Sequence, residues 1–175
     1  MLWIGLLHWP CLDKNGNEIA AAITNLDLHD LARVCLTYGI VTLYIVHPSQ
    51  SQLDFAQRIM DHWLKGFGGQ YNPLRKRAFE LIELVNDIDE IKRRTGALMV
   101  GTTATRIEGC ISWDDARTLA HARDICLLFG TGWGISPRLF TDFDAVIEPI
   151  AGKGDFNHLS VRSAVSIAVD RIAGR

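Results

Sequence analysis

The chain of 175 residues is 48% hydrophobic and 22% charged, a balance that excludes a disordered protein. Its net charge of −2 excludes a uniformly basic nucleic-acid coat but leaves room for local basic patches. No apolar run reaches the roughly 18 residues of a membrane-spanning helix, so we expect none. The length suits a single domain over residues 1–175.

The N-terminal stretch MLWIGLLHWP has no basic segment ahead of its apolar run, so it predicts a first strand and not a signal peptide. The cysteines form no C-x-x-C pair and no His/Cys cluster with zinc spacing. They are Cys11, Cys35, Cys110 and Cys126. We therefore expect no metal site, and free thiols in a reducing compartment, the cytoplasm.

Apolar runs of strand length alternate with segments of helix length, the pattern of an α/β domain with a mostly parallel sheet. We expect about six strands, with helices on both faces. The runs span 3–9, 41–46, 78–85, 97–101, 125–130 and 145–150. The pair Asn15-Gly16 within DKNGNE (13–18) predicts a tight turn that closes a short hairpin before the first helix.

The first long helix is predicted to begin near Asp27, which can cap it with Asp30 three residues later, and to end at Gly39. Its buried stripe comprises Leu28, Leu31, Cys35 and Tyr38. The last helix is predicted over 157–173, with a packed face of Val161, Val165, Ala168 and Ile172.

Residues 127–136, LLFGTGWGIS, follow a predicted strand and place Gly130, Gly132 and Gly134 at alternate positions. Loops at the carboxyl ends of strands bind ligands in open α/β sheets, and glycine lets a ligand approach the backbone. The spacing fits neither G-x-G-x-x-G nor the P-loop. A dinucleotide-dependent oxidoreductase using this loop stays open as an alternative, as does a turn without a ligand.

Three segments in this order resemble the signature motifs of SPOUT-class S-adenosylmethionine-dependent RNA methyltransferases. They are TNLDLHDLARVCLTYG (24–39), LLFGTGWGIS with DAVIEPI (144–150), and DFNHLSVRSAVSIAVDRI (155–172). The resemblance is closest to a stand-alone bacterial branch related to tRNA (guanine-N1)-methyltransferases. It implies methyl transfer to RNA, with a tRNA base as the favoured acceptor, and a homodimer with its active site at the subunit interface. It also implies a C-terminal trefoil knot, which no periodicity predicts.

In that class the loops of the knot bind S-adenosylmethionine largely through backbone groups. By position, the resemblance assigns this role to loops within 101–105, 129–134 and 150–159. The candidate cofactor-binding residues are Thr102, Thr103, Phe129, Gly130, Thr131, Gly132, Trp133, Gly134, Ile150, Asn157, Leu159 and Ser160. Enzymes of the class that methylate ribose usually have a glutamate in place of Gly132 and an asparagine in place of His158. Both departures favour a base as the acceptor.

Methyl transfer needs an in-line acceptor, and a nitrogen or oxygen acceptor must also lose a proton. Asp155, beside the proposed cofactor loops, is the first candidate base, and it is also placed to cap the last helix. Arg33 matches the arginine of the first motif and suits a phosphate or a developing charge, or else pairs with Asp30 or across a dimer. His158 is a candidate proton relay or a structural hydrogen-bonding group.

Two basic clusters, Arg75–Arg77 and Lys92–Arg94, suit RNA phosphates as well as a solvated surface. Tyr71, ahead of the first cluster, offers a ring for stacking on a base. A non-catalytic RNA-binding module with the same fold is the remaining alternative.

Overall fold

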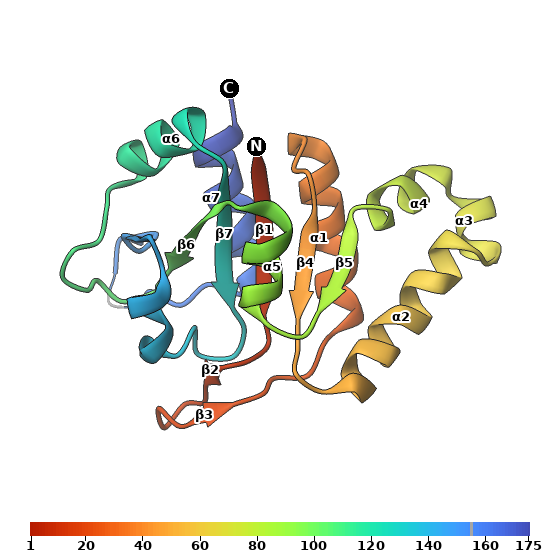
Figure 1. Ribbon diagram of the computed structural model, residues 1–175, viewed down its shortest axis with the longest axis horizontal. Coiled ribbons are helices and arrows are strands. Elements are labelled where there is room, and N and C mark those ends of the chain that lie inside the picture. Colours follow the sequence, from red (N-terminus) through yellow and green to blue (C-terminus); the bar gives the residue numbers. More distant parts are fainter. Residues whose placement is uncertain (155) are drawn as a thin grey trace.

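The computed structural model describes residues 1–154 and 156–175, and a six-stranded parallel sheet forms its centre (Figure 1). The strand order is β5-β4-β1-β7-β6-β8, and every neighbouring pair is parallel. The strands are β1 (Leu2–Leu7), β4 (Leu43–Val46), β5 (Ile82–Val85), β6 (Leu98–Thr102), β7 (Ile125–Gly130) and β8 (Ala145–Ile147). The predicted α/β class and six-stranded parallel sheet are confirmed.

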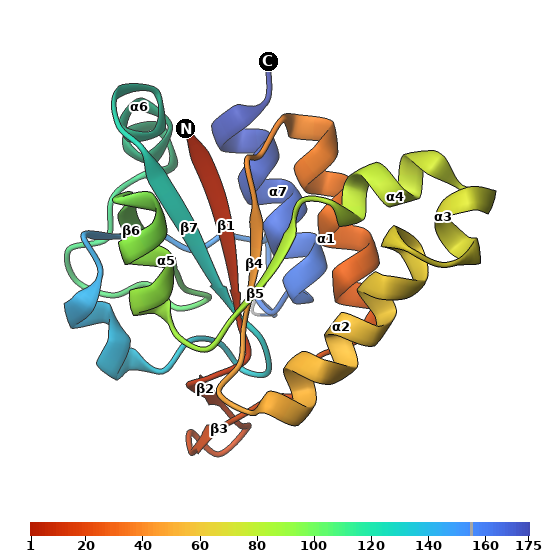
Figure 2. The ribbon, with the colours of Figure 1, turned by 45° about the vertical axis from the view of Figure 1, so that its right-hand side comes forward.

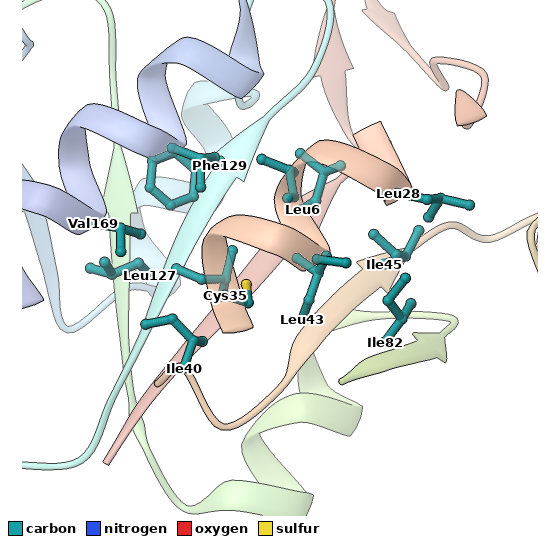
Figure 3. Packing of buried hydrophobic residues seen from close by; sticks show 14 of the residues in the cluster. Leu6, Leu28, Cys35, Ile40, Leu43, Ile45, Ile82, Leu127, Phe129 and Val169 are labelled. Carbon is teal, nitrogen blue, oxygen red and sulfur yellow. The ribbon is translucent and has the colours of Figure 1, made fainter. Parts of the chain in front are cut away.

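Alternate residues of the central strands pack against opposite layers. From β1, Ile4 and Leu6 face the layer that contains α1 (Asn25–Tyr38) and α7 (Val161–Ala173). Figure 3 shows Leu6, Leu127 and Phe129 meeting side chains of these two helices. Trp3 and Leu7 face the other layer, which contains α5 (Ile88–Thr95) and the 3-10 helix η1 (Pro137–Asp142). Burial on both faces explains why these strands are continuous apolar runs.

The remaining helices lie on the α1/α7 side of the sheet. They are α2 (Gln50–Leu64), α3 (Phe67–Tyr71), α4 (Pro73–Phe79) and α6 (Trp113–Ala122). Figures 1 and 2 place α3 and α4 beyond β5, at the opposite edge of the sheet from β8. The predicted strand 78–85 is partly wrong, because Ala78 and Phe79 end α4 and the strand begins at Ile82.

The predicted hairpin is confirmed, since β2 (Cys11–Leu12) pairs antiparallel with β3 (Glu18–Ile19) and Gly16 has φ +82°. Helix α1 begins two residues earlier than predicted, because the Thr24 hydroxyl accepts a hydrogen bond from the Asp27 N–H at 3.2 Å. It ends at Gly39 in the left-handed conformation, as predicted. Tyr38 is only half-buried, so the predicted stripe is buried over Leu28, Leu31 and Cys35.

The last helix begins later than predicted, at Val161 and not near 157, because the Ser160 hydroxyl caps it. Val165, Ala168 and Ile172 are buried as predicted, whereas Val161 is half-buried. The trefoil knot stays a prediction. Within the described residues, no helix has the length and apolar character needed to cross a membrane.

Candidate active site

A cavity of about 590 Å³ opens at the carboxyl ends of β6 and β7. Its walls come from the loop after β6, the glycine loop after β7, the segment leading into α7, and the residues between β3 and the start of α1. This volume lies within the range of small-ligand sites, about 300–1,000 Å³. The position is the edge where open parallel sheets bind ligands.

The three glycines of the loop after β7 each have a structural reason. A Cβ on Gly130 would lie 2.4 Å from the Ile135 nitrogen, because the loop folds back on itself there. Gly132 and Gly134 have φ of +60° and +108°, conformations that other residues rarely adopt. The Gly134 N–H donates to the Thr131 carbonyl at 3.0 Å and closes the turn. The glycines thus bring backbone up to the cavity wall.

The β2–β3 hairpin is hydrogen-bonded to this loop. The Trp133 N–H donates to the Leu12 carbonyl at 2.9 Å, and the Leu12 N–H donates to the Gly134 carbonyl at 3.0 Å. The Glu18 carboxylate accepts from the Ser136 hydroxyl and from the Arg138 guanidinium. These two hydrogen bonds, the one from Ser136 foremost, lower the pKa of Glu18. The loop therefore has a fixed shape before any ligand arrives.

The hydroxyls of the predicted threonines are already engaged. Thr102 donates to the Leu128 carbonyl at 2.8 Å, Thr103 to the Thr105 carbonyl at 2.8 Å and Thr131 to the Leu7 carbonyl at 3.1 Å. The bonds of Thr102 and Thr131 join neighbouring strands, and the bond of Thr103 stays within the loop after β6. The hydroxyl protons are therefore committed to the fold, and what these three residues offer a ligand is their backbone groups and hydroxyl lone pairs.

Residues after β8 close the other side of the cavity. The rings of Trp133 and His158 lie 4.9 Å apart and tilted by 30°, and both are exposed. The Asn157 side chain accepts from the Gly152 N–H at 3.0 Å and donates to the Ala104 carbonyl at 3.3 Å. Asn157 thus connects the segment before α7 to the loop after β6, so its side-chain amide stabilises the wall of the cavity.

The structure places every predicted cofactor-binding residue, and also His158, in the lining of this one cavity. Arg33 is not among the lining residues. It lies in an open groove between α1 and α7, where it pairs with Asp30 at 2.9 Å and is 57% exposed. Ser160 is shared by the groove and the cavity. Asp155, the predicted base, lies outside the described residues.

Sequence reasoning missed Asp27 as a site residue. Its carboxylate is buried, lines the cavity, accepts from the Thr24 hydroxyl at 2.6 Å and lies 3.4 Å from the Arg162 guanidinium. Arg162 also reaches Asp30 at 3.4 Å, so the chain of charges runs on to Arg33. An acidic residue in a first helical turn has the same sequence signature as an ordinary cap, and only the distant Arg162 distinguishes it.

Two further buried polar groups are notable, Trp113 in the lining of the cavity and His8 outside that lining. The Trp113 indole lines the cavity, and its N–H is buried without a hydrogen-bond partner among the described residues. His8, directly after β1, is fully buried, and neither ring nitrogen has a hydrogen-bond partner in the part of the chain that the structure describes. Burial, with a smaller contribution from His47, lowers the pKa of His8 to about 4. His8 is therefore neutral at physiological pH.

A parallel α/β sheet whose carboxyl-end loops enclose a backbone-lined cavity defines a ligand-binding α/β protein. A protein-family model described as SAM-dependent RNA methyltransferase matches residues 1–174. The chain belongs to this family and transfers methyl groups from S-adenosylmethionine to RNA. The SPOUT resemblance is confirmed, and the match favours methyl transfer over a dinucleotide oxidoreductase or a non-catalytic module.

An uncharacterized protein of Aquifex aeolicus is 40% identical, over 99% of this chain and 89% of that protein. A tRNA (guanine-N(1)-)-methyltransferase of Nitratidesulfovibrio vulgaris is 36% identical over 99% of this chain, which spans only 42% of that longer protein. The crystal structure of the A. aeolicus TrmH/SpoU tRNA modifying enzyme has a TM-score of 0.63 at 18% identity. It covers 98% of this chain and 73% of that one, and supports the fold.

The residues present fit S-adenosylmethionine. Glycines expose the backbone to a ligand, Trp113 offers an unpaired donor, and Asp27 is an anion at the wall of the cavity. When bound, this cofactor supplies an electrophilic methyl group on a positively charged sulfur. The buried Asp27 carboxylate favours a cation nearby, and the apolar side chains of Leu12, Phe129 and Ile150 exclude water.

Proposed function

We propose that this chain methylates a base of tRNA and not a ribose hydroxyl. The observation that carries the proposal is the geometry at Gly132, where the resemblance expects a glutamate in ribose methyltransferases. A Cβ there would lie 2.8 Å from the Leu12 carbonyl oxygen, and φ is +60°. A glutamate at this position would meet both backbone strain and a backbone clash.

The relatives support tRNA as the substrate class. Two of them carry the name tRNA (guanine-N(1)-)-methyltransferase, although this chain spans 42% of the length of each. Guanine N1 is accordingly the first acceptor atom to test. That nitrogen carries a proton at neutral pH, so the site needs a base.

We assign the roles of the site residues as follows. The cofactor contacts come from the predicted residues of the three loops, all of which line the cavity. Asp155 is the proposed base, on the segment between Gly154 and Phe156 that precedes α7. His158, whose ring lies 4.9 Å from that of Trp133 in the cavity lining, positions the acceptor base or relays its proton. Arg33 provides a positive charge for RNA phosphate or for the acceptor.

The position of Arg33 supports a homodimer. Within one chain it faces the α1/α7 groove and is absent from the lining of the cavity. A second copy seated on this groove would bring Arg33 of one subunit to the cavity of the other. We also propose that residues 1–175 act as one domain in the cytoplasm, where the RNA substrate and reducing conditions suit the four free cysteines.

The test is transfer of a labelled methyl group from S-adenosylmethionine to bulk bacterial tRNA, followed by mass spectrometry of the nucleosides. The expected product is a base-methylated nucleoside, with 1-methylguanosine the first candidate. A ribose-methylated nucleoside as the product would contradict base methylation. Asp155→Asn should lower the transfer rate while leaving S-adenosylmethionine affinity in calorimetry unchanged. An Asp89→Asn variant, at an exposed position of α5, controls for the loss of one negative charge.

A further inference from the structure

We propose that α3 and α4 carry a second RNA-binding surface, which stacks unpaired nucleotides of the substrate far from the methyl-transfer cavity. This aromatic platform consists of Phe67, Tyr71 and Leu74, flanked by Lys76 and Arg77. The inference rests on the RNA methyltransferase function and adds a contact site that methyl transfer itself does not require.

The platform exposes three large apolar side chains that lie close together in the sequence, on α3 and at the start of α4. Phe67, Tyr71 and Leu74 are 71%, 79% and 68% exposed, at successive spacings of four and three residues. The rings of Phe67 and Tyr71 lie 6.0 Å apart with planes 26° from parallel. Contiguous exposed apolar groups mark interaction sites, and two nearly parallel rings present flat faces to a ligand.

The platform is held rigidly from behind. Gly68 and Gly69 are buried against the end of α2, where a Cβ on Gly69 would lie 2.2 Å from the Trp63 carbonyl oxygen. The Arg75 guanidinium lies 5.5 Å from the centre of the Trp63 ring and contacts His29 of α1. The backbone that carries the two exposed rings is therefore closely packed against α2, so a ligand need not order this backbone when it binds.

Charge selects RNA as the occupant. Neither Lys76 nor Arg77 takes part in an ion pair of the described residues. Two members of the other basic cluster are engaged, since Arg94 pairs with Glu83 at 2.6 Å and also with Glu90, and Lys92 donates to the Asp142 carbonyl at 3.0 Å. Free cations beside exposed rings fit a phosphate backbone whose bases stack.

The nucleotides held here are unpaired, because base faces are hidden within a duplex. The platform lies beyond β5, and the cavity opens beside β6 and β7, toward the opposite edge of the sheet (Figures 1 and 2). One RNA molecule bound at both sites therefore offers two separate segments. In a tRNA these would be the acceptor nucleotide and a distant loop.

The first test measures the affinity of bulk bacterial tRNA by fluorescence anisotropy for Phe67→Leu/Tyr71→Leu and for Tyr71→Phe. The leucine variant keeps apolar bulk but loses the aromatic faces, so RNA affinity should fall roughly 10-fold or more. Tyr71→Phe should bind like the wild type. Calorimetry with S-adenosylmethionine should give the same affinity for all three proteins, and unchanged melting temperatures would show intact folding.

The second test uses Lys76→Ala/Arg77→Ala against a charge-matched control, Arg93→Ala/Arg123→Ala, in which both residues are exposed. The platform variant should weaken RNA binding and reduce the slope of log affinity against log salt by about 1.4, with no such change in the control. Ultraviolet crosslinking should attach a nucleotide to the peptide that contains Tyr71.

RNA affinity unchanged in the leucine variant would overturn the inference and point to a protein partner for the platform. A wild-type chain that does not bind bulk tRNA at all would overturn it as well. The first result, with S-adenosylmethionine binding intact, leaves the proposed base methylation standing, whereas the second result would also count against tRNA as the substrate. Failure to bind S-adenosylmethionine would instead refute the cofactor-site assignment.

Discussion

Two constraints favour glycine at position 132. Its φ is positive, and a Cβ would lie 2.8 Å from the Leu12 carbonyl oxygen. Gly132→Ala should lower stability by about 1–2 kcal/mol through φ alone, and further through the contact with Leu12. It should also weaken S-adenosylmethionine binding, because the loop must shift. Gly16→Ala is the matched control, since Gly16 has φ +82° but open space around it.

Urea unfolding and calorimetry separate the two effects at Gly132. Both variants should lose stability, and only Gly132→Ala should lose cofactor affinity. Equal cofactor affinity in the two variants would mean that the loop after β7 is not part of the cofactor site.

Asp27 links the cavity to the charges at the start of α7. Asp27→Asn preserves the shape and the hydrogen bond with Thr24 but removes the charge that faces Arg162. Because Arg162 is about one-third exposed, a double-mutant cycle with Arg162→Met should give a coupling of only about 1 kcal/mol. A coupling of zero in urea unfolding would show that the 3.4 Å pair contributes nothing to folding.

His8 makes the fold sensitive to mild acid. Its pKa is lowered to about 4 from 6.5, so the unfolded chain binds a proton that the folded chain does not. The contribution of His8 to the free energy of unfolding is therefore fully present above the unfolded pKa of 6.5. It falls as the pH drops below that value, by about 2 kcal/mol between pH 7 and pH 5. Urea unfolding of His8→Leu should show a flatter pH dependence, whereas the exposed His121→Gln should retain the steep one.

Among the elements, the β2–β3 hairpin is joined to the segment after the glycine loop by Glu18, whose carboxylate accepts hydrogen bonds from Ser136 and Arg138. The pKa of Glu18 is lower in the folded chain than its usual value of 4.5. The contribution of Glu18 to stability is therefore fully present at a pH above 4.5, and it is lost as the pH falls through the folded pKa. Glu18→Gln should weaken S-adenosylmethionine binding at neutral pH and remove part of the acid dependence of that binding. Cofactor affinity equal to the wild type across pH 3–7 would refute this role of Glu18.

Sequence patterns located elements best where burial was complete. The run 125–130 coincides with β7, which is buried along nearly its whole length. The run 78–85 instead merged the end of α4 with β5, because periodicity does not separate two short buried elements that follow each other. The start of α7 was misplaced because Ser160, and not an earlier residue, caps it.

The candidate site followed from motif resemblance for the loops but not for residues that act through tertiary contact. The cofactor candidates gather in one cavity, as their order after successive strands suggested. The sequence does not predict Asp27 as a site residue, because its partner Arg162 lies 135 positions away along the chain. The indole N–H of Trp113, which has no partner within residues 1–154 and 156–175, also has no signature in the sequence, since its burial depends on the surrounding packing.

For the whole molecule, the proposed homodimer predicts complementation between two defective chains. Arg33→Ala should bind S-adenosylmethionine but lose transfer, and Gly132→Ala should keep Arg33 but bind cofactor poorly. Unfolded and refolded together at equal amounts, they should regain about a quarter of wild-type transfer, because half of the dimers would hold one complete site. Sedimentation equilibrium checks the dimer, and a mixture with no recovered transfer would contradict a shared site.

Among the strands of the sheet, the central strand β1 is the first to be synthesised, and its two neighbours β4 and β7 follow it at different distances along the chain. It pairs with β4 through Leu43 and with β7 through Ile125. At about 5–20 residues per second, translation needs roughly 6–25 s to proceed from β1 to β7. During that interval an apolar strand waits with one edge unpaired, which makes the nascent chain a natural client for chaperones that shield hydrophobic segments.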